Sequence, residues 1–307
     1  MNARVAPLGV QDMKSRVVEF ARAASTEIST MDEKTVPELV GVLPKGITIY
    51  VAHTPKASLD DVVRVAIQVQ QLGFRASPHI VARRLESERA LRTALGQLTE
   101  AGVEQVLLVA GDPPNPPAYK STLEVIATGA IEQSGIKVAS VAGHPEGHKH
   151  VDDAELLAAL KYKQAWSERT GVKAQIATQF SFDADINCRW AKSLEQQGVT
   201  MPISIGVAGP TPITKLIKYA VACGVGASLN KVMGNLTAMA NLARMAVGAD
   251  QMMVAMLRGC EQHGVARIVR PHIFAFGGVL STAKWLRQVQ DGQFEIGEND
   301  KFEMAST

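Results

Sequence analysis

The chain has 307 residues, of which 46% are hydrophobic and 20% charged, enough apolar material for a sizeable core and too little charge for a disordered protein. Its 32 Lys and Arg against 30 Asp and Glu argue against a polybasic nucleic-acid binder or an acidic tail protein. The sequence shows no membrane span, no signal peptide and no disulfide or zinc spacing among Cys188, Cys223 and Cys260. A folded cytoplasmic protein with buried thiols is predicted.

Short β-branched runs alternate with segments of helical period along the whole chain. The predicted strands cover residues 26–29, 47–52, 76–81, 105–110, 137–142, 175–180, 203–207 and 268–274. Helix caps are predicted at Ser58, Ser87 and Asp152, with helix ends at Gly73, Gly102 and near Gly171. Further helices are predicted at about 119–134, 186–198, 212–223, 235–264 and 279–290. Every strand is thus followed by a helical segment, which indicates parallel crossovers.

Eight such units without a linker predict one α/β domain over residues 1–307, a closed (β/α)8 TIM barrel with an N-terminal helical extension at 1–23. A doubly wound open sheet is the alternative. In a barrel, chemistry is carried by the loops at the C-terminal ends of the strands.

Polar side chains and Gly–Pro loops gather at these predicted strand ends. They are Glu27, His53, His79, Gly111, Asp112, His144, Glu146, His148, Gln179 and the segments 206–212 and 274–278. Such a set predicts a pocket for a polar heterocycle or another flat ligand.

Two segments allow more than one interpretation. Residues 110–117 contain Gly111, Asp112 and four prolines, which fits either a ligand loop or a stiff turn that Asp112 caps. In residues 143–150, His144, His148 and His150 could bind a metal, as in a barrel metallohydrolase. Because the first strand end offers no His-x-His pair, imidazoles that donate to an anionic or carbonyl-rich ligand are favoured, and no metal is predicted.

Five motifs, each at a predicted strand end, resemble the flavoprotein methylenetetrahydrofolate reductases. They are Thr26-Glu-Ile28, Ser77-Pro-His-Ile80, Leu107-Leu-Val-Ala-Gly-Asp-Pro-Pro114, Ala142-Gly-His-Pro-Glu-Gly-His148 and Ala177-Thr-Gln-Phe-Ser-Phe-Asp183. The match runs from about residue 24 to 290. The resemblance implies a (β/α)8 barrel that binds FAD and exchanges a hydride with the one-carbon unit of tetrahydrofolate, with NADH as a candidate electron donor.

The resemblance also implies roles for individual residues. Glu27 would be the general acid, and we expect desolvation to raise its pKa; a rim glutamate paired to a lysine is the alternative. Asp112 would act beside flavin and folate as a second catalytic residue. Gln179 and Phe276, with Asp112, would bind the folate. The residues implied for the cofactor are His79, Gly111, Asp112, His144, His148 and Lys163.

Some positions depart from the family pattern. Ala110 stands where bacterial members often carry arginine, His144 where they often carry tyrosine, Ile49 in place of a threonine, and Ile213 in place of an aromatic residue. These changes predict weaker FAD binding and leave the nicotinamide site less preserved than the pterin site. The alternatives are a flavin-free enzyme using NADH directly, a metal-dependent barrel hydrolase, and a folate-binding or methyl-transferring barrel without redox chemistry. Direction, electron partner and subunit number stay open.

Overall fold

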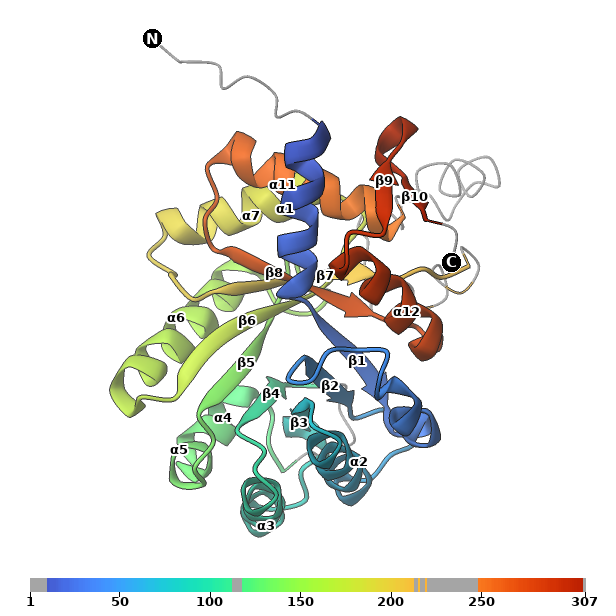
Figure 1. Ribbon diagram of the computed structural model, residues 1–307. Helices are drawn as coiled ribbons and strands as arrows, with labels where there is room; N and C mark the ends of the chain where they lie inside the picture. Colours follow the sequence, from blue (N-terminus) through green and yellow to red (C-terminus); the bar gives the residue numbers. More distant parts are fainter. Residues whose placement is uncertain (1–9, 112–117, 213–214, 216–218, 220–247, 306–307) are drawn as a thin grey trace.

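A computed structural model describes residues 10–111, 118–212, 215, 219 and 248–305. Eight parallel strands form a closed barrel in chain order, because β1 pairs with both β2 and β8 (Figure 1). The strands are β1 Ser25–Ser29, β2 Thr48–Ala52, β3 Arg75–Val81, β4 Gln105–Val109, β5 Val138–Gly143, β6 Lys173–Phe180, β7 Ile203–Ala208 and β8 Ile268–Phe274. The predicted TIM barrel is confirmed, and the open sheet is excluded.

Helices surround the strands (Figure 1). They are α2 Leu59–Gln71, α3 Glu88–Glu100, α4 Thr122–Ala127, α5 Ala130–Gln133, α6 Asp153–Thr170, α7 Ala184–Gln196, α11 Ala249–His263 and α12 Val279–Gln290. The Ser58, Ser87 and Asp152 side chains accept the predicted capping hydrogen bonds from backbone amides.

Three connections differ from the prediction or lie beyond the described residues. The single helix predicted at 119–134 is two short helices, because Gly129 adopts a left-handed backbone with φ 70°. A 3-10 helix, η1 Thr30–Leu39, connects β1 to β2. Most of the predicted helix at 212–223 and the first part of the one at 235–264 lie outside the described residues.

Helix α1, Val10–Arg22, ends just before β1 and lies against β8 and α12 (Figure 1). It buries Met13, Val17 and Phe20. Its end is joined to α12 by two hydrogen bonds, from Arg22 Nε to the Gln290 carbonyl and from Gln290 Nε2 to the Ala21 carbonyl. The extension is therefore part of the barrel's packing.

The chain continues past α12 into a two-stranded hairpin, β9 Phe294–Ile296 and β10 Phe302–Met304, around a short 3-10 turn, η3 Glu298–Asp300. The sequence analysis missed it because three-residue strands are too short to show a period. Within the described ranges, no helix is long and apolar enough to cross a membrane.

A polar network fills part of the barrel interior, where branched apolar residues usually predominate. Arg270 Nη2 donates to Gln175 Oε1 at 3.0 Å, and Gln175 Nε2 donates to Ser140 Oγ at 2.9 Å. The Ser140 and Tyr50 hydroxyl oxygens lie 2.8 Å apart. Tyr50, Ser140 and Gln175 are buried and Arg270 is partly exposed. The network therefore fixes the Tyr50 ring inside the barrel.

Candidate active site

Three ionisable side chains meet inside the barrel and form what we call the acid cluster: Glu27 on β1, His79 on β3 and His272 on β8. Glu27 Oε2 lies 3.2 Å from His79 Nε2 and 3.7 Å from His272 Nε2. The His272 ring packs edge-on against Tyr50, with centroids 4.5 Å apart. Only 19% of the Glu27 side chain is exposed, and 2% of His272, so water has limited access to the carboxylate.

The electrostatics of Glu27 differ from the prediction. Burial raises the pKa of Glu27, as expected, but the contacts with His272 and His79 outweigh burial and bring its pKa down to about 2. The expected net increase in the pKa of Glu27 is therefore wrong. The partners are also imidazoles rather than the lysine of the alternative interpretation. Glu27 is consequently ionised at neutral pH.

His272 is a member of the cluster that the sequence analysis did not identify. Its Nδ1 lies 2.9 Å from the buried Ser25 hydroxyl, which orients the ring so that Nε2 faces Glu27. The signal was present in the alternation of β8, where Arg270, His272 and Phe274 share one face. His272 lies two residues before the end of β8, and the sequence analysis considered only residues at the strand ends, so it did not include His272.

An aromatic wall continues from the acid cluster along β8 and its exit loop. The His272 and Phe274 ring centroids are 4.7 Å apart, and the Phe274 ring stacks on Phe276 with centroids 5.7 Å apart. Tyr219 and Phe180 pack on Phe276 at 4.6 Å and 4.9 Å. Phe276, predicted to bind folate, has a left-handed backbone with φ 43°, which is a strained conformation for an aromatic residue.

Gln179, the second residue predicted to bind folate, lies at an irregularity of β6. The pairing of β6 with β7 shifts between Ala177 and Phe180. The Thr178 hydroxyl bridges the gap by accepting from the Gly206 amide at 2.8 Å and donating to the Gln179 carbonyl at 2.8 Å. A Cβ at Gly206 would lie 2.4 Å from that carbonyl oxygen, so glycine is required there. Such bulges re-aim side chains next to active sites.

The Gly-Asp loop is described up to Gly111, and Asp112 lies outside the described residues. Gly111 has φ 74°, and a Cβ on it would lie 2.2 Å from Val81 Cγ1, so no other residue fits. Arg83 donates from Nη1 to the Gly111 carbonyl at 2.6 Å and from Nε to the Lys120 carbonyl at 2.9 Å. This arginine, which the sequence analysis missed, therefore holds both ends of the loop.

A second group, which we call the cationic rim, contains His144 and His148 after β5 and Lys163 on α6. The His144 and His148 rings pack edge to face, with centroids 5.0 Å apart. Burial, followed by the neighbouring His148 and Lys163, lowers the pKa of His144 to about 4. Burial lowers the pKa of Lys163 to about 8. Lys163 is 7% exposed, and burial is the only cause that shifts its pKa, so among the described residues no charged or hydrogen-bonding partner offsets that burial.

The histidines of the 143–150 segment do not gather around a common centre. His148 Nδ1 accepts from the His150 backbone amide, and the rings of these two residues lie 6.1 Å apart. Among the described residues, no group of three or more His, Cys, Asp or Glu side chains is arranged to hold a metal ion. His53, another strand-end histidine, is buried with Nε2 3.0 Å from the Ala57 carbonyl and helps to fix the following turn.

A closed parallel barrel that carries a buried carboxylate, imidazoles and an aromatic wall has the arrangement of a barrel enzyme for a flat polar ligand. The family model of methylenetetrahydrofolate reductase matches residues 27–285. The chain therefore belongs to the methylenetetrahydrofolate reductase family, as its five motifs predicted, and the family implies an oxidoreductase.

The chain is similar at low identity to solved structures of other proteins. A protein from Clostridium thermocellum that binds two copies of 5-methyl-5,6,7,8-tetrahydrofolic acid is 10% identical with a TM-score of 0.59, over 90% of this chain and 97% of that one. Dihydropteroate synthase from Thermus thermophilus is 14% identical with a TM-score of 0.43, over 85% of this chain and 91% of that one. Of the two, only the Clostridium thermocellum structure has a TM-score above 0.5, and at 10% identity it shows a shared fold and nothing more.

Proposed function

We propose that the chain is an FAD-dependent methylenetetrahydrofolate reductase that interconverts 5,10-methylenetetrahydrofolate and 5-methyltetrahydrofolate. The observation that carries the proposal is the acid cluster beside the aromatic wall, inside a barrel of this family. A carboxylate is needed because the five-membered ring of the methylene form opens with uptake of a proton and closes with its loss. The Clostridium thermocellum protein, with the same fold, binds a reduced folate, which supports the substrate class.

Glu27 and its two imidazoles would carry this proton. In the oxidising direction an ionised Glu27 is ready to accept the proton that ring closure releases. In the reducing direction the proton would come from His272 or His79, and Glu27, which contacts both Nε2 atoms, would deliver it to the folate. A bound pterin would exclude the remaining water from Glu27 and so favour its protonated form. The acid role is thus assigned to the cluster rather than to an isolated glutamic acid.

The cationic rim fits FAD. Lys163 is a buried cation without a described counter-ion, and a phosphate of the cofactor would supply one. His144 lies close enough to Lys163 for their charges to interact, His148 packs on His144, and both imidazoles would donate to the cofactor's polar chain or phosphates. Gly111, with its left-handed backbone packed against Val81, would set the course of the loop beside the cofactor. When bound, FAD would supply the hydride acceptor and donor. NADH is proposed as the source of the electrons in the reducing direction.

The aromatic wall and the β6 bulge would hold the folate. Phe276 is buried with Phe274 and Tyr219 stacked on its ring, so in this proposal it supports the apolar wall that a pterin ring would contact. The Gln179 carboxamide can donate to and accept from the pterin edge. Asp112 is proposed as the third pterin contact, next to the Gly111 carbonyl that Arg83 fixes. The unusual backbone of Phe276 supports a binding role, because such strain persists where the surrounding structure enforces it.

The first test is an absorption spectrum of the purified protein, taken alone and after titration with FAD. We expect a flavin band, bleached without oxygen by NADH or by 5-methyltetrahydrofolate. Lys163→Met should lower FAD affinity, whereas the exposed Lys161→Met, two residues away on α6, should not.

Two other results would replace the proposal. A protein that binds no flavin yet oxidises NADH with methylenetetrahydrofolate is the flavin-free enzyme. A protein whose only turnover is lost on chelation and restored by a divalent metal is the barrel hydrolase. Flavin bleaching by neither NADH nor folate would contradict the redox assignment itself.

A further inference from the structure

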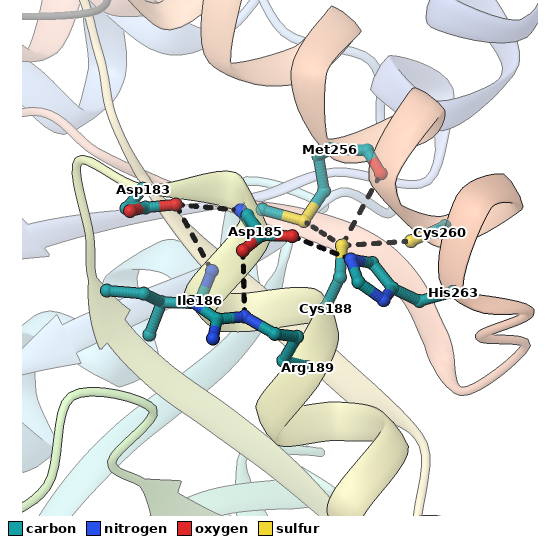
Figure 2. Close-up of polar contacts among 8 residues, drawn as sticks. All are labelled: Asp183, Asp185, Ile186, Cys188, Arg189, Met256, Cys260 and His263. Carbon is teal, nitrogen blue, oxygen red and sulfur yellow. Dashed lines mark hydrogen bonds and ion pairs between the residues drawn. The ribbon is translucent and has the colours of Figure 1, made fainter.

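Two cysteines face each other between the outer helices α7 and α11, outside the acid cluster and the cationic rim. Cys188 Sγ lies 4.0 Å from Cys260 Sγ, although the two residues are 72 positions apart in the chain (Figure 2). Cys188 is fully buried, as the sequence predicted, whereas Cys260 is half-buried. The third cysteine, Cys223, lies outside the described residues.

The packing of the two helices brings the sulfurs this close. A Cβ on Gly259 would lie 2.8 Å from Cys188 Sγ, so the glycine before Cys260 leaves space for the thiol. Beside the pair, Asp185 on α7 accepts from His263 Nε2 on α11 at 2.6 Å (Figure 2). The two helices are therefore already joined next to the cysteines, and the sulfurs are held in register before any bond forms.

The two thiols differ in their chemical surroundings. The hydrogen bond from Cys188 lowers the pKa of Cys260, against the effect of burial, and Arg16 on α1 adds to the lowering. The same hydrogen bond, followed by burial, raises the pKa of Cys188. Cys188 also lies 3.8 Å from the Met256 carbonyl and 3.7 Å from Met256 Sδ (Figure 2). Cys260 is thus the more acidic and more accessible thiol, and Cys188 is the buried thiol beside it.

We propose that Cys188 and Cys260 are a peroxide-sensitive pair that closes reversibly to a disulfide between α7 and α11. The Cys260 thiolate attacks hydrogen peroxide and becomes a sulfenic acid, with release of hydroxide. The Cys188 sulfur then attacks the Cys260 sulfur, the S–O bond breaks, and the hydroxyl leaves as water with the Cys188 proton. In total two thiols lose two protons and two electrons, and one peroxide is reduced to two waters.

The disulfide would tie together the helices that support two walls of the site. Helix α7 follows β6, which carries Gln179, and α11 precedes β8, which carries His272 and Phe274. A cross-link closing such a long loop restricts the unfolded chain, so we expect the oxidised protein to melt higher by about 5 °C. A thiol reductant should reverse the shift.

The test treats the full-length protein with hydrogen peroxide, blocks free thiols by alkylation and maps peptides without reduction. We expect a cross-linked peptide joining residues 188 and 260, lost on reduction with dithiothreitol. In Cys188→Ser, a dione probe for sulfenic acid should label Cys260. In Cys260→Ser, oxidation of Cys188 should be slower by at least about tenfold, because the thiolate is absent. Cys223→Ser should form the cross-link at the wild-type rate.

Three results would overturn the proposal. They are alkylation of both Cys188 and Cys260 after peroxide treatment, over-oxidation of Cys260 without a cross-link, and a disulfide that includes Cys223. Because the readout is the peptide map and the melting temperature, none of these results depends on FAD or folate. The proposed disulfide and the proposed reductase activity can therefore be contradicted independently of each other.

Discussion

The acid cluster and the cationic rim use the same residue types in opposite ways. In the acid cluster, histidines meet a carboxylate, and the contacts outweigh burial, so that Glu27 stays ionised. In the cationic rim, His144 and Lys163 lie near each other without a described carboxylate, and burial lowers the pKa of both. The first group is complete within the protein, whereas Lys163 of the second has no counter-ion among the described residues; in the proposal a cofactor phosphate would supply it.

This difference separates the two proposed roles. Ionisable groups that already contact one another before the substrate binds are suited to transferring a proton, because their relative geometry is already set. A buried cation without a counter-ion destabilises the folded protein and favours binding of an anion. Removing a member of the acid cluster should therefore lower the rate of turnover. Removing the buried Lys163 cation should lower the affinity for the cofactor and raise the free energy of unfolding.

The largest effect is expected from Glu27→Gln. This variant keeps the shape of the side chain but cannot exchange a proton, so folate turnover should fall by about 100-fold to 10,000-fold. Flavin content should stay unchanged, because Glu27 lies in the acid cluster. Steady-state assays and the absorption spectrum measure both, with Glu100→Gln at the exposed end of α3 as the control. Near-normal turnover would point to a folate-binding or methyl-transferring barrel.

Lys163→Met should separate stability from cofactor binding. Methionine fills similar space without a buried charge, so the apoprotein should gain about 1–3 kcal/mol in free energy of unfolding at pH 7. FAD affinity should fall by roughly tenfold to a hundredfold because a phosphate loses its partner. Denaturant unfolding and FAD titration test the two effects. A variant that loses both stability and affinity would show that Lys163 is a structural residue instead.

His144 of the cationic rim and Glu27 of the acid cluster should affect the free energy of unfolding in different pH ranges. His144 has a pKa of about 4 in the folded chain and 6.5 as its ordinary value, so the unfolded chain binds more protons between these values and stability falls as pH drops from 6.5 to 4. Glu27, with a pKa of about 2 in the folded chain against 4.5 ordinarily, loses its contribution from pH 4.5 to 2, a range that overlaps the first only between pH 4.5 and 4. His144→Phe should remove only the first loss, as thermal melts from pH 3 to 8 would reveal; an unchanged profile would contradict the assignment.

Stability should also rise at high pH because of Lys163. Its pKa is about 8 in the folded chain against 10.5 ordinarily, so the folded chain releases its proton first and gains stability as pH increases from 8 to 10.5. FAD binding should weaken over the same range as the cation is lost. In Lys163→Met both trends should disappear.

The smallest effect is expected from Ser25→Ala. The His272 ring would lose its 2.9 Å contact at Nδ1 and hold Glu27 less firmly, so the pKa of Glu27 should rise slightly. Turnover should change by about twofold to fivefold, with the acid limb of its pH profile moved upward. A pH–rate profile that matches wild type would exclude a positioning role for Ser25.

The barrel was predictable because its signals are local. Strand length, helix caps at Ser58, Ser87 and Asp152, and the regular alternation of elements depend on residues close in the sequence, and these three capped helix starts agree with the structure. The division of α4 from α5 and the last hairpin were not predicted, because Gly129 was not distinguished from a helical glycine and the hairpin strands are three residues long. The five motifs identified the family for the same local reason.

The sequence by itself determined the order of elements and the family. It also singled out Glu27, His79, His144 and His148 at predicted strand ends, whereas Lys163 came only from the family resemblance. Tertiary structure alone decided that His272 joins Glu27, that Glu27 is ionised, that Arg83 closes the Gly111 loop and that Cys188 meets Cys260. The physical reason is the distance along the chain over which each signal acts. Hydrophobic periods and helix caps depend on residues a few positions apart. The pKa of a carboxylate and the contact between two thiols depend on groups far apart in the sequence, which only the closed barrel brings within about 4 Å.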